Sequence, residues 1–224
     1  MKNYRKQQYL NVNGDLFIQS ATPQHAYILG LRWADSTIIS KYKKKELRFE
    51  MKEDDINSIR HIFDATGNWS ESRRVRKNRS PQIVLSCNNA KLVDYLIDND
   101  YGIKSRVSPI KIINSYDEKH IKYFIRGWID GDGCFYHNKK HGLNQFYLSG
   151  TYEQNWDAIE EFLNLHTIQY KIIRVVSRNG NKYSNVRVTG IKNIIKIYNA
   201  IYDSDTDTIC MPRKLLKCLE IINQ

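Results

Sequence analysis

A ten-residue segment occurs twice in this chain and constrains its fold more than any other feature. YILGLRWADS occupies residues 27–36, and FIRGWIDGDG occupies residues 124–133. When the two segments are aligned, the glycine at the fourth position and the aspartate at the ninth position coincide. In both copies the aspartate comes directly after a small residue. An internal repeat of this kind indicates that the chain contains two structurally similar halves.

The small residues of the repeat stand four apart, at Gly30 and Ala34 in the first copy and at Gly127 and Gly131 in the second. A glycine inside a helix costs about 1 kcal/mol relative to alanine, so a gain in packing must offset it. Small residues at positions i and i+4 form a flat stripe on which another helix can lie closely. We therefore expect two helices that pack on each other through these residues.

Packing the two helices in this way brings Asp35 and Asp132 to the same end of the pair. Carboxylates that are close together at helix C-termini are repelled by each other and by the helix dipole. A divalent cation between them relieves this repulsion, because such cations prefer oxygen ligands. The repeat thus predicts a metal site built from two aspartates.

The segments after each copy follow the same order. In the first half we expect strands at 37–42 and 46–51, a helix at 53–66, a basic hairpin ending in strand 81–87, and a helix at 89–100. In the second half we expect strands at 134–138 and 144–150, a helix at 155–166, strands at 170–177 and 182–189, a helix at 192–202, and a last helix that begins at Pro212. No βαβ alternation occurs, so we predict an α+β fold of two αββαββα half-domains. The predicted units are an N-terminal extension (1–22), a first half-domain (23–104), a linker (105–120) and a second half-domain with a C-terminal helix (121–224).

The segments ILGLRWADS (28–36) and IRGWIDGDG (125–133) resemble the signature of the LAGLIDADG homing endonucleases, in their single-chain form with two motifs. The resemblance implies two pseudo-symmetric half-domains that pack through their LAGLIDADG helices, with saddle-shaped antiparallel sheets that lie in the DNA major groove. The first copy departs from the signature, because Trp33 replaces its first aspartate and Ser36 replaces its final glycine. We expect Ser36 to matter more, because a residue just past a helix end often needs a positive φ, which glycine adopts most easily.

The resemblance also implies roles for individual residues. Asp35 and Asp132 would be the catalytic acids and would bind Mg²⁺ or another divalent cation such as Mn²⁺. A basic residue often stands at the end of the second strand of a half, which makes Lys52 a further catalytic candidate, whereas Thr151 occupies the matching place in the second half. We interpret Asp130 as a helix-surface or N–H-bonding residue rather than as a metal ligand.

The charge of the chain favours an anionic partner. It has 35 lysines and arginines against 24 acidic residues, a formal net charge of +11. This charge favours nucleic acid as the partner first and an anionic membrane surface second, and the third interpretation is that it serves solubility alone. The basic residues cluster in the predicted hairpins, where we expect contacts with double-stranded DNA. The candidates are Lys41, Lys43, Lys44, Lys45, Arg73, Arg74, Arg76, Lys77, Arg79, Lys139, Lys140, Arg174, Arg178, Lys182 and Arg187.

Strand alternation divides the first of these clusters. On a strand, Arg74 and Arg76 would point to one face. Arg73 and Lys77 would then point to the other, and only one of the two pairs could reach base edges. In the second half, weaker candidates for base contacts are Tyr147, Tyr183 and Asn185.

Two other groups of polar residues resemble metal sites less well. His137 and His141 are four residues apart, but their segment is typical of a strand end and turn. The acidic run DSDTD (203–207) lacks the spacing and the terminal glutamate of a calcium-binding EF-hand loop. We therefore expect DNA contact or plain exposure for the histidines and a solvated loop for the acidic run.

Taken together, these features predict a sequence-specific, Mg²⁺-dependent endonuclease that makes a staggered double-strand break in a long, non-palindromic DNA target. We expect a monomer without a membrane partner. The N-terminal sequence lacks the apolar core of a secretory signal, so we expect a cytoplasmic protein (phage- or bacterium-encoded) or an organellar one. Two alternatives stay open on the same scaffold: a maturase that binds group I intron RNA, and a catalytically inactive DNA-binding regulator.

Overall fold

The computed structural model describes residues 11–41, 44–202 and 208–224, which form two similar halves. The first half comprises α1 (Gly14–Ile18), α2 (Pro23–Ala34), β1 (Ser36–Lys41), β2 (Lys44–Lys52), α3 (Glu53–Asp64), β3 (Ser70–Arg74), β4 (Gln82–Asn88) and α4 (Ala90–Asp98). The short helices η1 (Tyr101–Ile103) and α5 (Ile110–Ile113) lead to the second half. The second half comprises α6 (Glu118–Asp132), β5 (Gly133–Asn138), η2 (Lys139–His141), β6 (Leu143–Thr151), α7 (Asp157–Leu165), β7 (Tyr170–Val176), β8 (Lys182–Thr189), α8 (Ile191–Tyr202) and α9 (Pro212–Ile222).

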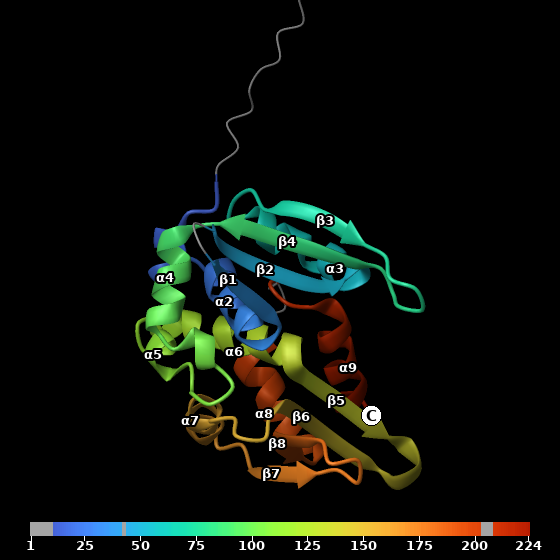
Figure 1. Ribbon diagram of the computed structural model, residues 1–224. Coiled ribbons are helices and arrows are strands. Elements are labelled where there is room, and N and C mark those ends of the chain that lie inside the picture. Colours follow the sequence, from blue (N-terminus) through green and yellow to red (C-terminus); the bar gives the residue numbers. More distant parts are fainter. Residues whose placement is uncertain (1–10, 42–43, 203–207) are drawn as a thin grey trace, which may run out of the picture.

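Both halves contain an antiparallel sheet with the same strand order. The orders are β1-β2-β4-β3 and β5-β6-β8-β7, and the two sheets lie on either side of the central helices α2 and α6 (Figure 1). In β2, Leu47, Phe49 and Met51 are buried against the helices, while the residues between them point the other way. Each sheet thus has one helix-covered face and one face without helices, which we call the open face. The predicted α+β class and the pseudo-symmetric αββαββα halves are confirmed.

The helices α2 and α6 pack at very short range because of their small residues. A Cβ atom on Gly30 would lie 1.8 Å from the carbonyl oxygen of Phe124. One on Gly127 would lie 2.1 Å from the carbonyl oxygen of Tyr27. Both distances are far below any van der Waals contact, so only glycine fits at either position. The predicted stripe of small residues is therefore the contact surface between the two helices.

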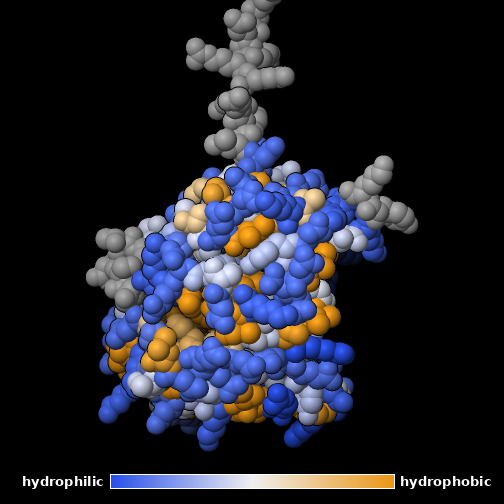
Figure 2. All heavy atoms as spheres, turned by 90° about the vertical axis from the view of Figure 1, so that its left-hand side faces the viewer, coloured by the Kyte–Doolittle hydropathy of each residue, from blue (hydrophilic) through white to orange (hydrophobic). Residues whose placement is uncertain are grey.

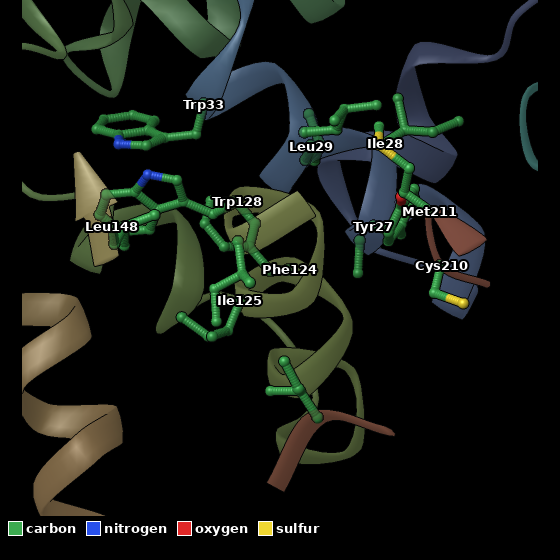
Figure 3. Packing of buried hydrophobic residues seen from close by; sticks show 14 of the residues in the cluster. Tyr27, Ile28, Leu29, Trp33, Phe124, Ile125, Trp128, Leu148, Cys210 and Met211 are labelled. Carbon is green, nitrogen blue, oxygen red and sulfur yellow. The ribbon is translucent and has the colours of Figure 1, made fainter. Parts of the chain in front are cut away.

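Large aromatic side chains fill the space around this helix pair (Figure 3). Trp33 is buried, and its ring centroid lies 6.3 Å from that of Trp128. Trp128 in turn stacks on Trp156, with 6.0 Å between ring centroids and an interplanar angle of 14°. Trp33 thus replaces the first aspartate of the signature with a core residue that joins the two halves.

The described part of the N-terminal extension, residues 11–22, and the linker both belong to the packed structure. In α1, Phe17 is fully buried, and its ring centroid lies 6.1 Å from that of Trp69. The side chain of Asn89 donates a hydrogen bond to the carbonyl of Val12 at 3.0 Å. At the other boundary, α6 begins at Glu118, inside the predicted linker.

Hydrophilic residues dominate the side of the molecule on which α4, α5 and α7 lie (Figure 2). Among the described residues, no helix combines the length and the apolar character needed to cross a bilayer.

Candidate active site and nucleic-acid interface

Asp35 and Asp132 stand at the C-terminal ends of the two central helices. Asp35 caps α2, and its backbone N–H donates to the carbonyl of Leu31 at 3.0 Å. Asp132 is the last residue of α6. The close crossing of the helices continues to this end, because a Cβ on Gly131 would lie 2.3 Å from the Cβ of Ala34. The residues directly before the two acids are therefore in contact, as the repeat predicted.

The two acids share one electrostatic environment. The pKa of Asp132 is raised to about 6, chiefly by burial; the charge of Lys104 lowers it, the charge of Asp35 raises it, and that of Lys214 lowers it. Burial also raises the pKa of Asp35, as do Glu50 and Asp55, while Lys104 lowers it. Partly buried carboxylates with acidic neighbours are a strong site for a cation.

Two lysines that the sequence did not reveal lie at this end of the helices. The Nζ atom of Lys104 donates to the carbonyl oxygens of Trp33 (2.9 Å), Ala34 (3.1 Å) and Ser36 (3.4 Å), around the C-terminus of α2. The Nζ atom of Lys214 donates to the carbonyl oxygen of Gly133, just past α6. A cation at a helix C-terminus interacts favourably with the helix dipole. Both helix ends thus carry an acid and a lysine.

The donor set at this end fits a hard divalent cation that keeps part of its hydration. Among the described residues, no group of three or more histidine, cysteine or acidic side chains is placed to hold a metal ion. Two carboxylates are nevertheless sufficient for Mg²⁺, which usually binds one or two protein carboxylates and completes its shell with water and substrate phosphate. The residues that would hold it are Asp35 and Asp132. Of the two other groups considered above as metal sites, the acidic run 203–207 lies outside the described residues. In the histidine pair, the Nδ1 atom of His137 contacts Oδ1 of Asn144 at 2.5 Å.

Asp130 is a structural residue in the core. It is fully buried and accepts hydrogen bonds from the hydroxyl groups of Tyr27 (2.8 Å) and Tyr202 (2.9 Å) and from the backbone N–H of Met211 (2.6 Å). The expected N–H-bonding role is thus present, whereas the expected helix-surface position is wrong. The bonds join α2, α6, α8 and the segment before α9.

Ser36 and Gly133 differ for a reason other than the one expected. Neither has a positive φ: Gly133 has a φ of −80°, and Ser36 is absent from the positive-φ residues among the described ones. A Cβ on Gly133 would lie 2.4 Å from the carbonyl oxygen of Ile129, so crowding requires glycine there. In the first half the Ser36 hydroxyl donates to the carbonyl of Arg32 at 2.5 Å. The serine therefore fits its position and contributes a hydrogen bond to the end of α2.

The DNA-contact candidates of the first half divide between the two faces of its sheet. The strand register places Lys41, Lys44, Lys52 and Arg74 on the open face. In contrast, Lys45 binds Asp94 of α4, and Arg73 binds both carboxylate oxygens of Glu53 in α3, at 2.8 and 2.9 Å. These two are on the helix-covered face. Lys43 lies outside the described residues.

The alternation argument holds for Arg73 and Arg74 but not for Arg76 and Lys77, because β3 ends at Arg74. Arg76, Lys77 and Arg79 lie in the loop that follows β3. Arg74 and Arg76 still share a side, since both bind Glu50, at 2.8 and 2.7 Å. Sequence reasoning also missed Arg48, an open-face residue that Glu46 holds at 2.9 Å.

The open face of the second sheet has a different character. The register puts Tyr147, Tyr183, Asn185 and Arg187 on it, and the Arg187 guanidinium lies over the Tyr147 ring, 5.1 Å from its centroid. Lys139 and Lys140 lie in η2 at the tip of one hairpin, and Arg178 lies in the turn of the other. Arg174 and Lys182 alternate with the open-face residues and belong to the opposite face. Asn185 is buried there. The first open face is therefore rich in charge, and the second is rich in aromatic groups.

Comparisons with known proteins agree with this architecture. Residues 119–202 match the family model described as a LAGLIDADG-like domain. The structure of the homing endonuclease I-WcaI bound to its DNA recognition sequence is similar over 97% of this chain and 94% of that one, with a TM-score of 0.61 and 17% identity. I-GzeII, a LAGLIDADG homing endonuclease in complex with a DNA target, is similar over 89% of each chain, with a TM-score of 0.52 and 12% identity.

Two further structures share the fold. An I-DmoI variant in complex with its target DNA in the presence of Mn is similar over 82% of this chain and 95% of that one, with a TM-score of 0.52 and 16% identity. Full-length WhiA from Thermatoga maritima is similar over 95% of this chain and 66% of that one, with a TM-score of 0.53 and 12% identity. No curated protein sequence matches the chain.

Proposed function

We propose that this chain is a sequence-specific DNA endonuclease. Residues 119–202 match a LAGLIDADG-like domain, and 97% of the chain is similar in fold to the homing endonuclease I-WcaI. The observation that carries the proposal is the pairing of Asp35 and Asp132 at the joined C-termini of α2 and α6. Partial desolvation raises the pKa values of both acids, and the charge of Asp35 also raises that of Asp132, as expected for two carboxylates that face the same cation site. Because the two halves differ in their open faces, the expected target is long and non-palindromic.

The open faces would bind the duplex, with one half on each side of the cut. On the first sheet, Arg48 and Arg74 offer the planar donors that read guanine in the major groove. The lysines at the strand ends and hairpin tips would bind phosphates, which fixes the position of the protein but not its sequence preference. The second sheet offers tyrosine side chains and Arg187 instead, while the amide of Asn185 is buried, so its half-site would be read with different contacts.

Asp35 and Asp132 would hold Mg²⁺ or Mn²⁺ together with the scissile phosphates. Such a cation supplies Lewis acidity toward water and phosphate oxygens. The residues of the chain would position the phosphates and offset the negative charge that develops on them. Lys104 and Lys214 provide fixed positive charges behind the acids. Lys52 lies on the open face beside Glu50, and the charge of Glu50 raises the pKa of Asp35. Lys52 would therefore approach the phosphate from the DNA side.

The test is a selection followed by a matched substitution. Cleaved sites would be recovered from a randomised DNA library with Mg²⁺, and the best site would then be used with purified variants. Asp35→Asn and Asp132→Asn should each abolish double-strand cleavage while DNA affinity stays within about tenfold, because the amide keeps the shape but loses the charge. Asp98→Asn is the control, since Asp98 is exposed and also ends a helix, α4.

Each alternative predicts a different result. If the selection yields specific binding sites but no cleaved ends, with either Mg²⁺ or Mn²⁺, the protein is a DNA-binding regulator and not an endonuclease. Tight binding of a folded group I intron RNA together with weak binding of every DNA would favour the maturase. Parental cleavage by the Asp132→Asn variant would remove Asp132 from the site.

A further inference from the structure

The lysine at each helix end is carried by a segment that is fixed to the opposite half of the molecule. Lys104 follows α4 and η1 of the first half and binds the C-terminus of α2, a helix of the same half. Lys214 is in α9, the last helix of the second half, and binds the carbonyl just past α6, a helix of the same half. Residues beside each lysine, however, make hydrogen bonds to the opposite half: the carbonyl groups of Lys104 and Ser105 bond the second half, and the side chain of Arg213 bonds the first.

Gln154 fixes the segment that carries Lys104. It is buried in the corner between β6 and α7 of the second half, and its Nε2 atom donates to the carbonyl oxygens of Lys104 (3.1 Å) and Val107 (3.4 Å). The neighbouring Thr151 hydroxyl donates to the carbonyl of Ser105 at 2.8 Å. In addition, the Ser108 hydroxyl accepts the backbone N–H of Ala158 in α7 at 3.0 Å.

Asp55 fixes the segment that carries Lys214. It is buried in α3 of the first half and accepts two hydrogen bonds from Arg213, from Nε at 2.5 Å and from a terminal guanidinium nitrogen at 3.0 Å. The ring of His61, also in α3, contacts the carbonyl of Thr208 at 3.2 Å. In Figure 1 the chain before α9 accordingly passes beside α3 before α9 turns toward β5.

Gln154 and Asp55 occupy matched places, because each comes three residues after the last residue of the second strand of its half. We infer that Gln154 and Asp55 are positioning residues for Lys104 and Lys214, so that each half of the molecule orients the lysine at the other half's acid. The inference rests on the proposed function for its catalytic consequence, but the positions of the lysines can be measured without it.

The first measurement does not depend on cleavage. Metal-free, DNA-free protein would be treated briefly with an amine-acylating reagent, and the modification of each lysine would be read by peptide mass spectrometry. Lys104 is half-buried and Lys214 is buried in the parent. Gln154→Met should raise the modification of Lys104 several-fold and leave Lys214 unchanged, and Asp55→Asn should do the reverse. Thr66→Val is the control for general loosening, because it removes the buried hydrogen bonds of the Thr66 hydroxyl with Phe63 and Trp69, which involve neither lysine.

The second measurement is single-turnover cleavage of the selected DNA site at saturating protein. Gln154→Met should slow cleavage by about tenfold to a hundredfold at unchanged DNA affinity, the size expected when a charged group is displaced by about 1 Å. Equal modification of Lys104 in the parent and in Gln154→Met, or an increase at both lysines like that in Thr66→Val, would overturn the inference. So would an increase at Lys104 without slower cleavage. If the parent cuts no DNA, the proposed function fails, and the acylation pattern alone decides whether the crossed positioning exists.

Discussion

The close contact between α2 and α6 can be tested by adding a methyl group at Gly131 and then removing the one it meets at Ala34. Gly131→Ala would place its Cβ 2.3 Å from the Cβ of Ala34, where about 3.6 Å or more is needed. The helices would have to separate by roughly 1 Å, which costs about 1–3 kcal/mol as overpacking. The gain in helix propensity, at most about 1 kcal/mol, offsets part of this cost. We therefore expect a net loss of about 1–2 kcal/mol in the free energy of unfolding.

The double variant Gly131→Ala/Ala34→Gly should recover that loss. With the Ala34 methyl removed, the new Cβ keeps only ordinary contacts, 3.6 Å to Cδ1 of Leu31 and 3.7 Å to Cα of residue 34. Ala34→Gly alone should cost at most about 1 kcal/mol, because it removes a helix-forming residue at the end of α2. The coupling between the two changes should then be about 2 kcal/mol. Urea unfolding followed by tryptophan fluorescence measures all four proteins, and strictly additive effects would refute the close crossing.

Two further predictions concern pH and salt. Burial raises the pKa of Asp132 to about 6 from 3.8. In the metal-free protein the contribution of this group to stability is therefore fully present below pH 3.8 and is lost as the pH rises through 6. The affinity for Mn²⁺, measured by calorimetry, should instead fall by about tenfold per pH unit below pH 6, because the cation requires the ionised carboxylate. If about eight phosphates are neutralised, the logarithm of the DNA association constant should fall against the logarithm of the salt concentration with a slope near −7, and a slope shallower than about −3 would contradict an extended interface. Replacing Arg74 and Arg76 with alanine should flatten the slope by about 1–2 units, whereas Lys45→Ala should leave it unchanged because Lys45 binds Asp94 on the helix-covered face.

The repeat in the sequence was sufficient to predict the fold and the close packing of the two helices that end at the acids. Helix crossing through small residues follows from local sequence, because the spacing of Gly127 and Gly131 leaves few ways to offset their cost in a helix. Strand positions were also predictable where apolar residues alternate, as in β2. In β3 no apolar residue marks the buried face, so the sequence could not tell whether Arg73 or Arg74 faces outward.

The lysines at the acids could not be predicted from the repeat. An offset of 97 residues matches Lys104 with Ile201, a fully buried core residue. The lysine that takes the equivalent place is Lys214, because the segment from the end of α8 to Lys214 is longer than the segment from the end of α4 to Lys104. Only the tertiary structure brings such segments to the helix ends, where the carbonyl groups require donors.

The two half-sites should differ in rate, because they match in their acids and in these lysines but not at the ends of β2 and β6. Lys52 ends β2 with an exposed ammonium group, whereas Thr151 ends β6 with a hydroxyl that donates to Ser105. A lysine near the scissile phosphate balances developing negative charge and contributes about 3 kcal/mol where water is excluded. Thr151 brings no charge.

We therefore expect the two DNA strands to be cut at different rates, with a nicked intermediate that accumulates during a single turnover. Lys52→Met should slow one strand by about a hundredfold or more and the other far less, because only one half has a lysine at this place. Strand-specific end labels on the selected site measure both rates in one reaction. Lys44→Met is the matched control, since Lys44 begins the same strand on the same open face. If Lys52→Met slows both strands equally, or slows neither, Lys52 is an ordinary surface lysine, and the difference between the half-sites must arise from the contrast between their charged and aromatic open faces.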